Sequence, residues 1–249
     1  MFNPDTMVLD CNAALGRRYN ERVAADTRED LLRAMSEAGI SRAVVYNPYS
    51  EVWGTMEGNE LLLEEIAGNT CLLPQFVVDF ATDDFEEVSR RVRQAGIRSL
   101  RVFPKTHRYP FVHWIADPWL DWMAREGLAL WIRMGYKFEV EARDLYETAT
   151  RHPDVPIVLA GSHYSNYSIV WPILKAVKNL VFDLSRFDIP NGVERLIRHI
   201  GVGRLLYGSD YPQVDPEPYL YFLHRCGLRP DELRAICHDN LCRLLHLEG

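Results

Sequence analysis

The feature of this sequence that most constrains its fold is a regular alternation of short apolar runs with amphipathic stretches. Eight strand-like runs occur, and each is followed by a helix-like segment. The predicted strands cover residues 8–11, 42–46, 72–80, 99–103, 129–134, 157–160, 180–184 and 204–207. The predicted helices cover residues 31–38, 60–67, 85–95, 118–126, 139–151, 168–177, 193–199 and 231–245.

Local signals mark the ends of several predicted helices. Thr27 and Asp30 form a capping box before the first helix, which Gly39 ends. Asp117 and Pro118 predict the start of another helix, and Gly127 its end.

Short connections between strands and helices favour one parallel sheet. Eight such units in 249 residues suit a closed barrel better than an open doubly wound sheet. No linker-like tract or internal repeat interrupts the pattern. We therefore predict an α/β protein in which residues 1–249 form one (β/α)8, or TIM, barrel domain.

Composition and charge exclude several classes of function. The chain is 47% hydrophobic and has a net charge of −7, with no basic block longer than two residues, so we expect no nucleic-acid partner. No run of about 18 apolar residues and no signal-peptide pattern occurs, so we expect no membrane partner. The five cysteines lack CxxC spacing, which together with the missing signal predicts a cytoplasmic protein. No glycine-rich nucleotide loop follows a strand, and we predict no cofactor.

The ends of the predicted strands are rich in arginine. In a TIM barrel the chemistry lies where strands end and the following loops begin. Arg101, Arg133 and Arg186 occupy such positions, although the whole chain is acidic. Guanidinium groups bind carboxylates and phosphates through paired hydrogen bonds. The sequence therefore predicts a small anionic molecule as the ligand of the barrel mouth.

Two segments carry a resemblance to a known family. Residues 204–212 read RLLYGSDYP, and Asn240 precedes the run LCRLLHL at 241–247. The first strand, VLDCNAALG at 8–16, has the outline of an "IDxHxHxG" opening. Together these segments resemble the amidohydrolase superfamily. The similarity is to its TIM-barrel metal-dependent hydrolases and decarboxylases, of which aminocarboxymuconate semialdehyde decarboxylase is an example. The resemblance extends over essentially the whole chain.

The resemblance implies a metal site whose ligands are mostly absent here. Family members hold a divalent metal with two histidines of strand one, one of strand five and the aspartate of strand eight, and a strand-six histidine assists. The corresponding residues in this chain are Asn12, Ala14, Arg133, Asp210 and Gly161. Catalytic zinc needs three protein ligands, so we predict that no metal binds at this position. We expect Arg133 and Asp210 to pair in its place, directly or through one water molecule.

Seven residues are candidates for the functional site. Asp210 and His163 are the candidate catalytic residues, and the candidate substrate-binding residues are Arg133, Arg101, Arg186, Asn12 and Tyr211. Each has a structural alternative: Asp210 as an ion-pair partner, His163 as a loop or capping residue, and some of the arginines as solvated side chains. Asp10 is expected to be a hydrogen-bonded carboxylate that stabilises the end of the barrel.

Three hypotheses of function follow. The first is a metal-independent, lactonase-like hydrolase that binds a substrate carboxylate through arginines and activates water with Asp210. The second is a metal-dependent hydrolase with shifted ligands such as His163, Asp210 and Asp10. The third is a catalytically degenerate barrel that binds a ligand or a partner protein.

The aromatic segment 109–122 has two interpretations. It contains Tyr109, Phe111, Trp114, Trp119 and Trp122. Exposed aromatic side chains would suit a homodimer interface. The helical spacing of Trp119 and Trp122 fits the protein core equally well.

Overall fold

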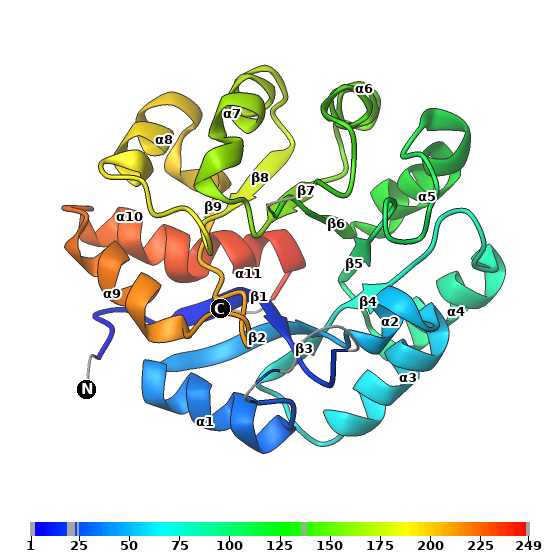
Figure 1. Cartoon of the computed structure of the whole chain (residues 1–249), viewed down its shortest axis with the longest axis horizontal. Coiled ribbons are helices and arrows are strands. Elements are labelled where there is room, and N and C mark those ends of the chain that lie inside the picture. Colours follow the sequence, from blue (N-terminus) through cyan, green and yellow to red (C-terminus); the bar gives the residue numbers. More distant parts are fainter. Residues whose placement is uncertain (1–2, 19–22, 24, 136–137, 248–249) are drawn as a thin grey trace.

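The computed structural model describes residues 3–18, 23, 25–135 and 138–247, in which strands alternate with helices (Figure 1). The strands are β1 (Val8–Ala14), β2 (Ile40–Tyr46), β3 (Leu72–Pro74), β4 (Phe76–Val77), β5 (Ser99–Val102), β6 (Ala129–Arg133), β7 (Ile157–Ala160), β8 (Leu180–Asp183) and β9 (Leu205–Leu206). The helices are α1 (Arg28–Ala38), α2 (Tyr49–Val52), α3 (Thr55–Glu65), α4 (Phe85–Ala95), α5 (His113–Glu126), α6 (Ala142–Arg151), α7 (Tyr167–Ala176), α8 (Gly192–Ile200), α9 (Pro216–Arg225), α10 (Pro230–Arg234) and α11 (Asn240–Leu245).

The strands close into a (β/α)8 barrel. They form two parallel sheets, ordered β1-β2-β3 and β4-β5-β6-β7-β8-β9. The backbone of Gln75 donates to Val45 at 2.8 Å, so β3 and β4 are two halves of one barrel strand that pairs with β2 and then with β5. On the other side, Cys11 N–H donates to Tyr207 O at 3.0 Å and joins β9 to β1. The predicted barrel is confirmed.

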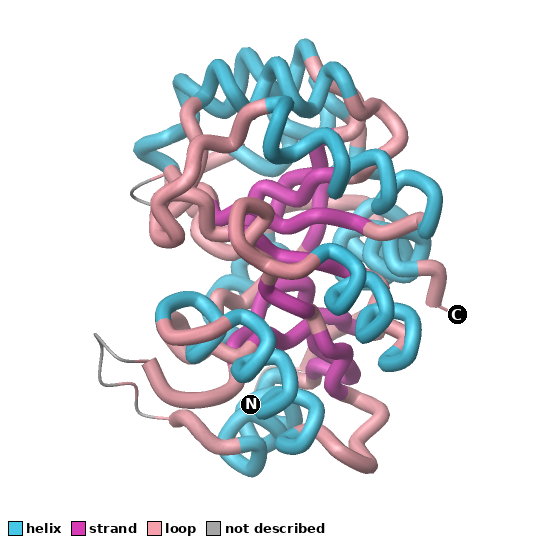
Figure 2. The backbone as a smooth tube through the Cα atoms, turned by 90° about the vertical axis from the view of Figure 1, so that its right-hand side faces the viewer, coloured by secondary structure: helices cyan, strands magenta, loops and turns pink. Residues whose placement is uncertain are grey.

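The helices lie outside the strands, which run through the centre of the molecule (Figure 2). Inward-facing residues of the strands form an apolar cluster that includes Leu9, Trp131 and Val158 together with Leu241 and Leu245 of α11. The ring of His246 lies next to Gly127, which precedes β6, so α11 closes the amino-terminal end of the barrel. The opposite end, where the strands finish, is the barrel mouth. Among the described residues, no helix combines the length and apolar character needed to cross a membrane.

Local capping signals predict several helix ends correctly. The Thr27 side chain accepts a hydrogen bond from Asp30 N–H at the start of α1. Gly39, Gly96 and Gly127 adopt the left-handed conformation after α1, α4 and α5, with φ of 72°, 65° and 66°. Only glycine adopts this conformation without a steric penalty, which explains why these positions end helices.

Other elements differ from the prediction. Helix α5 begins at His113 rather than at Pro118, because Val112 O accepts the first hydrogen bonds of the helix. Asp117 does not cap it; its carboxylate pairs with Arg151 and His152 instead. Helices α2 and α9, which carry residues of the mouth and its surroundings, were not predicted.

The aromatic segment 109–122 belongs mainly to the core. Tyr109, Phe111, Trp119 and Trp122 are buried, whereas Trp114 is 66% exposed. The indole of Trp119 stacks on Phe80 with ring centroids 5.1 Å apart. Of the five aromatic residues named in this segment, only Trp114 is exposed enough to support the predicted homodimer interface.

Candidate active site

Asn12 lies at the centre of a buried polar layer beneath the barrel mouth. Its Oδ1 accepts a hydrogen bond from Arg101 Nη2 at 2.8 Å, and its Nδ2 donates to Asp183 Oδ2 at 3.0 Å. Arg101 also donates to Gln75 Oε1 at 2.6 Å, and its guanidinium lies over the ring of Tyr46 at 4.2 Å. Asn12 thus links a buried cation to a buried carboxylate, and both ends of its amide are engaged.

Asp183 is held by donors that follow β7 and by Ser185, just after its own strand β8. It accepts hydrogen bonds from the backbone of Gly161 at 2.8 Å and from the backbone and hydroxyl of Ser185. Burial raises the pKa of Asp183, although these hydrogen bonds oppose the shift. A Cβ on Gly208 would overlap the Asp183 carboxylate, so only glycine fits there. Asp183 therefore stabilises the floor of the mouth.

Asp210 stands above this layer at the end of the eighth barrel strand. Its backbone has φ of 58° and donates to Asn12 O at 2.9 Å. A Cβ placed on Gly161 would lie 3.9 Å from Asp210 Oδ1 and 4.0 Å from Asn12 Nδ2. Three of the five positions that the resemblance associates with the metal site, Asn12, Gly161 and Asp210, therefore lie close together. The Asp210 carboxylate also pairs with Arg186 at 3.4 Å.

Arg133 and Asp210 form no direct ion pair in the described part of the chain, and a contact through one water molecule stays a prediction. Arg133 donates to Gln213 Oε1 at 3.0 Å and lies 3.8 Å from a carboxylate oxygen of Glu51. Arg186, on the strand end next to Asp210, takes the place predicted for Arg133. The unpredicted helix α2 supplies the competing carboxylate of Glu51.

Arg101 does not reach the open part of the mouth as a substrate-binding residue would. Its side chain is 2% exposed and held by Gln75 and Asn12. Burial lowers the pKa of Arg101, and the Arg133 charge adds to this effect, but a guanidinium stays protonated in proteins. Arg101 therefore provides a permanent positive charge beneath Asp210.

His163 and Arg186 both line a cavity of about 360 Å³, which is also lined by Tyr219 and Phe222. His163 Nδ1 interacts with Ser165, at 2.8 Å from its hydroxyl, at the start of a 3₁₀ turn. Nδ1 of His163 therefore has the capping role that is the structural alternative for this residue. Its catalytic role stays a prediction.

Tyr211 is not brought together with the other candidates. Its side chain lines a separate cavity of about 310 Å³ between α1 and α9, next to Arg33 and Glu217. Burial raises the pKa of the Tyr211 hydroxyl. The residue directly follows Asp210, whose φ of 58° is left-handed, so the backbone changes direction between the two residues.

Sequence analysis missed two charged residues of the mouth, Arg18 and Glu51. Arg18 Nη2 donates to the Tyr46 hydroxyl at 3.0 Å, and its Nη1 lies 3.7 Å from Glu51. Arg18 follows β1, so its position after a strand could have identified it. Glu51 lies in the four-residue helix α2, which has no periodic pattern to reveal it.

Asp10 behaves as predicted. It accepts hydrogen bonds from the backbones of Asn12 and Ser209, both at 2.9 Å, and from the Ser209 hydroxyl. These bonds connect β1 to the segment after β9. Asp10 therefore helps to close the barrel just below the mouth.

The amidohydrolase family model matches residues 4–247, nearly the whole chain. The chain belongs to the amidohydrolase family. A search of curated proteins finds no match.

Solved structures with the same barrel are distant in sequence. The 2,6-dihydroxybenzoate decarboxylase from Rhizobium is 14% identical, with a TM-score of 0.78 and coverage of 98% of this chain and 100% of that one. A putative 2-pyrone-4,6-dicarboxylic acid hydrolase from Pseudomonas putida is 14% identical, with a TM-score of 0.74 and 98% coverage of both chains. The 5-carboxyvanillate decarboxylase from Novosphingobium aromaticivorans, solved with manganese, is 11% identical, with a TM-score of 0.80 and 98% coverage of both. These similarities establish the barrel fold.

The side chains at the family's metal position do not form a metal's ligand set. The Asn12 amide is engaged at both ends, Gly161 offers no side-chain donor, and Asp210 is paired with Arg186. In the described ranges, no three histidine, cysteine, aspartate or glutamate side chains gather closely enough to hold a metal ion. The shifted set of His163, Asp210 and Asp10 accordingly forms no ligand cluster.

Proposed function

We propose that this amidohydrolase-family protein hydrolyses a small carboxylate-bearing substrate, a lactone or an amide, without the family's metal. The observation that carries the proposal is the environment of Asp210. Its carboxylate lies at the mouth, 3.4 Å from Arg186 and above the buried charge of Arg101. The Asp210 carboxylate, which is 13% exposed, can hold a water molecule, and the Arg186 guanidinium next to it can hold the anionic group of a substrate.

Unpaired donors beneath and around the mouth support an oxygen-rich ligand. Arg18 Nε, Gln75 Nε2 and the Ser162 hydroxyl are buried and have no hydrogen-bond partner among the described residues. Buried donors without partners are costly, so they favour a ligand that accepts hydrogen bonds. Carboxylate and carbonyl oxygens are such acceptors.

The chemical step follows from these positions. Asp210 removes a proton from water, and the water oxygen bonds to the substrate carbonyl carbon. The charge that develops on the carbonyl oxygen is stabilised by the nearby guanidinium of Arg186. When the ring C–O bond or the amide C–N bond breaks, protonated Asp210 returns the proton to the leaving atom. The net reaction adds one water to the substrate.

The names of the structurally similar enzymes are consistent with an acidic substrate. The names of the three enzymes compared above denote a dicarboxylic lactone and two aromatic carboxylates. The cavity beside Arg186 has apolar walls formed by Val214, Pro218 and Phe222, which suit a ring next to a carboxylate.

A binding protein without catalysis is the second candidate. The specific observation in its favour is that Asp210 already pairs with Arg186, so that its carboxylate is engaged by a neighbouring side chain rather than left to bind water. Such a barrel would bind the anion and leave it unchanged.

The test measures hydrolysis of 2-pyrone-4,6-dicarboxylate and of simpler carboxylated lactones by protein treated with a chelator and checked by elemental analysis. We expect turnover to survive chelation and Asp210→Asn to lower kcat about a thousandfold, the usual effect of removing a general base. The control Asp231→Asn removes an exposed carboxylate that pairs only with its neighbours on the surface. Activity that chelation abolishes and zinc restores would favour the metal-dependent alternative. Binding without turnover would favour the binding protein.

A further inference from the structure

The carboxylate of Glu51 lies between two arginines of the barrel mouth. Its Oε1 is 3.8 Å from Arg133 Nη1, and its Oε2 is 3.7 Å from Arg18 Nη1. Each arginine thus faces one oxygen of the same carboxylate. Hydrogen-bonded arginine–carboxylate pairs are usually about 2.7–2.9 Å long, so both contacts are loose.

The loose contacts are made by buried groups. The side chain of Arg18 is 6% exposed and that of Glu51 is 15% exposed. Arg18 Nε has no hydrogen-bond partner among the described residues. Burial raises the pKa of Glu51, although Arg133 and Arg18 oppose the shift. Glu51 therefore satisfies the two arginines incompletely, and a better-placed anion would satisfy them more fully.

We propose that Arg18 and Arg133 form a carboxylate-binding subsite of the mouth, and that Glu51 fills it as an internal substitute until a ligand carboxylate displaces it. The inference rests on the proposed function, because it assigns a subsite for the substrate's anionic group. It adds Arg18 and Glu51 to the residues that determine which ligands bind.

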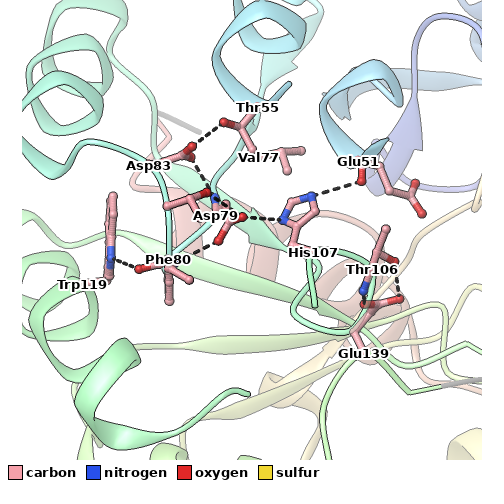
Figure 3. A network of polar contacts seen from close by, with 12 residues as sticks. Glu51, Thr55, Val77, Asp79, Phe80, Asp83, Thr106, His107, Trp119 and Glu139 are labelled. Carbon is pink, nitrogen blue, oxygen red and sulfur yellow. Dashed lines mark hydrogen bonds and ion pairs between the residues drawn. The ribbon is translucent and has the colours of Figure 1, made fainter. Parts of the chain in front are cut away.

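The structure shows how Glu51 can leave without unfolding α2. His107 Nε2 donates to the backbone carbonyl of Glu51 at 3.1 Å, and this contact anchors the main chain (Figure 3). The Glu51 carboxylate points away from the His107 ring, so the side chain can rotate while the backbone stays in place (Figure 3). Next to it is a cavity of about 740 Å³, lined by Glu51 itself and by Asp79, Thr106 and His107.

The same cavity favours the return of Glu51. Carboxylates dominate its lining, which contains one arginine, Arg108, and the acidic residues Asp79, Asp83, Asp84 and Glu87. An ionised Glu51 that rotates into this acidic surrounding is repelled by like charges. It moves back to Arg18 and Arg133 when the ligand dissociates. The subsite is therefore filled by a negative charge with or without ligand.

Competition by Glu51 weakens ligand binding by a predictable factor. If Glu51 fills the subsite about nine-tenths of the time, only about a tenth of the protein is ready to bind, and the apparent Kd is about tenfold higher than the intrinsic one. Removing the charge of Glu51 removes this competition.

The experiment measures the Kd of succinate and of inorganic phosphate by calorimetry for wild type and Glu51→Gln. We expect Glu51→Gln to lower the Kd of succinate about tenfold. In the Glu51→Gln background, Arg18→Gln or Arg133→Gln should raise the Kd again. The matched control Glu57→Gln removes the same charge from α3, in a residue that lines the cavity and is paired with neither arginine. It should leave the Kd within about twofold of wild type.

Any of the following results would overturn the inference. An unchanged or higher Kd in folded Glu51→Gln would show that Glu51 does not compete; if Arg186→Gln still abolished binding, the anion site of the proposed function would stand alone. An equal gain in Glu57→Gln would show a general charge effect. No binding of either anion to any variant would reject the subsite and the proposed anion site together. If Glu51→Gln unfolds, Glu51→Asp, which keeps the charge on a side chain one methylene shorter, should still lower the Kd, and an unchanged Kd would reject the competition.

Discussion

Asp10 shows how burial can dominate over good hydrogen bonding. Three donors surround its carboxylate, and each favours the ionised form. Burial nevertheless raises the pKa of Asp10 from 3.8 to about 6, and the nearby Asp183 adds to the shift. The hydrogen bonds to Asp10 help to close the barrel, whereas burial of its ionised carboxylate destabilises the folded state.

This shift makes stability depend on pH. Because the folded pKa exceeds the unfolded one, the folded state binds more protons between 3.8 and about 6, and the free energy of unfolding falls as pH rises through this window. Between about pH 4.5 and about pH 7.5 we expect wild type to lose about 2 kcal/mol relative to Asp10→Asn. Urea unfolding of both proteins at the two pH values measures the difference. The surface variant Asp231→Asn should follow wild type, and a difference between wild type and Asp10→Asn that is constant with pH would refute the pKa shift.

At the scale of elements, the short helix α2 depends strongly on its neighbours. It spans Tyr49–Val52, and its local cap is Asn47, whose Oδ1 accepts a hydrogen bond from Tyr49 N–H at 2.9 Å. Its position comes from the contact of Glu51 O with His107 and from close packing of Ser50 against Gly58 of α3. A shift of α2 would move the Glu51 carboxylate at the mouth.

The packing of α2 on α3 leaves no room for a side chain at residue 58. A Cβ on Gly58 would lie 2.5 Å from the backbone nitrogen of Ser50, so one helix must move. We expect Gly58→Ala to lower the free energy of unfolding by about 1–3 kcal/mol, the usual cost of overpacking. The control Gly203→Ala meets only Arg243 Nη2 at 3.6 Å, an ordinary contact, and should unfold nearly as wild type does. Chemical denaturation measures the free energy of unfolding of both variants. Equal values would show that α2 can move away from residue 58 without loss of stability.

The same contrast explains what the sequence could predict. Elements with local signals were found, such as α1 between Thr27 and Gly39. The position of Asp210 is predicted by its motif, and the resemblance aligns Asn12, which the structure places inside β1 rather than after its end. The ion-pair partner of Arg133 could not be predicted from the sequence. That partner is Glu51, which lies near Arg133 only because of tertiary contacts. Helix α2 is too short to show a period of its own.

At the scale of the whole molecule, the two ends of the barrel have different tasks. Buried polar groups from β1, β5 and β8 converge below the mouth and position charge. The other end is apolar and is closed by α11, whose Asn240 donates to Leu205 O and Val202 O at 2.8 Å and fixes the helix against β9. Changes at the closed end should therefore affect stability and spare binding.

Leu241 allows this separation to be tested. Its side chain is 1% exposed and packs in the cluster that fills the barrel interior. Leu241→Ala should lower the free energy of unfolding by about 2–5 kcal/mol, because it removes buried apolar contacts and leaves a cavity. The succinate Kd of the folded fraction should stay within about twofold of wild type, since the mouth lies at the other end. Leu61→Ala, at a position that is 44% exposed, is the matched control and should cost less than about 1 kcal/mol. Denaturation and calorimetry on the same samples give both quantities. If Leu241→Ala weakened succinate binding tenfold while remaining folded, the barrel interior would couple its two ends, and the division between a stabilising end and a binding end would be incorrect.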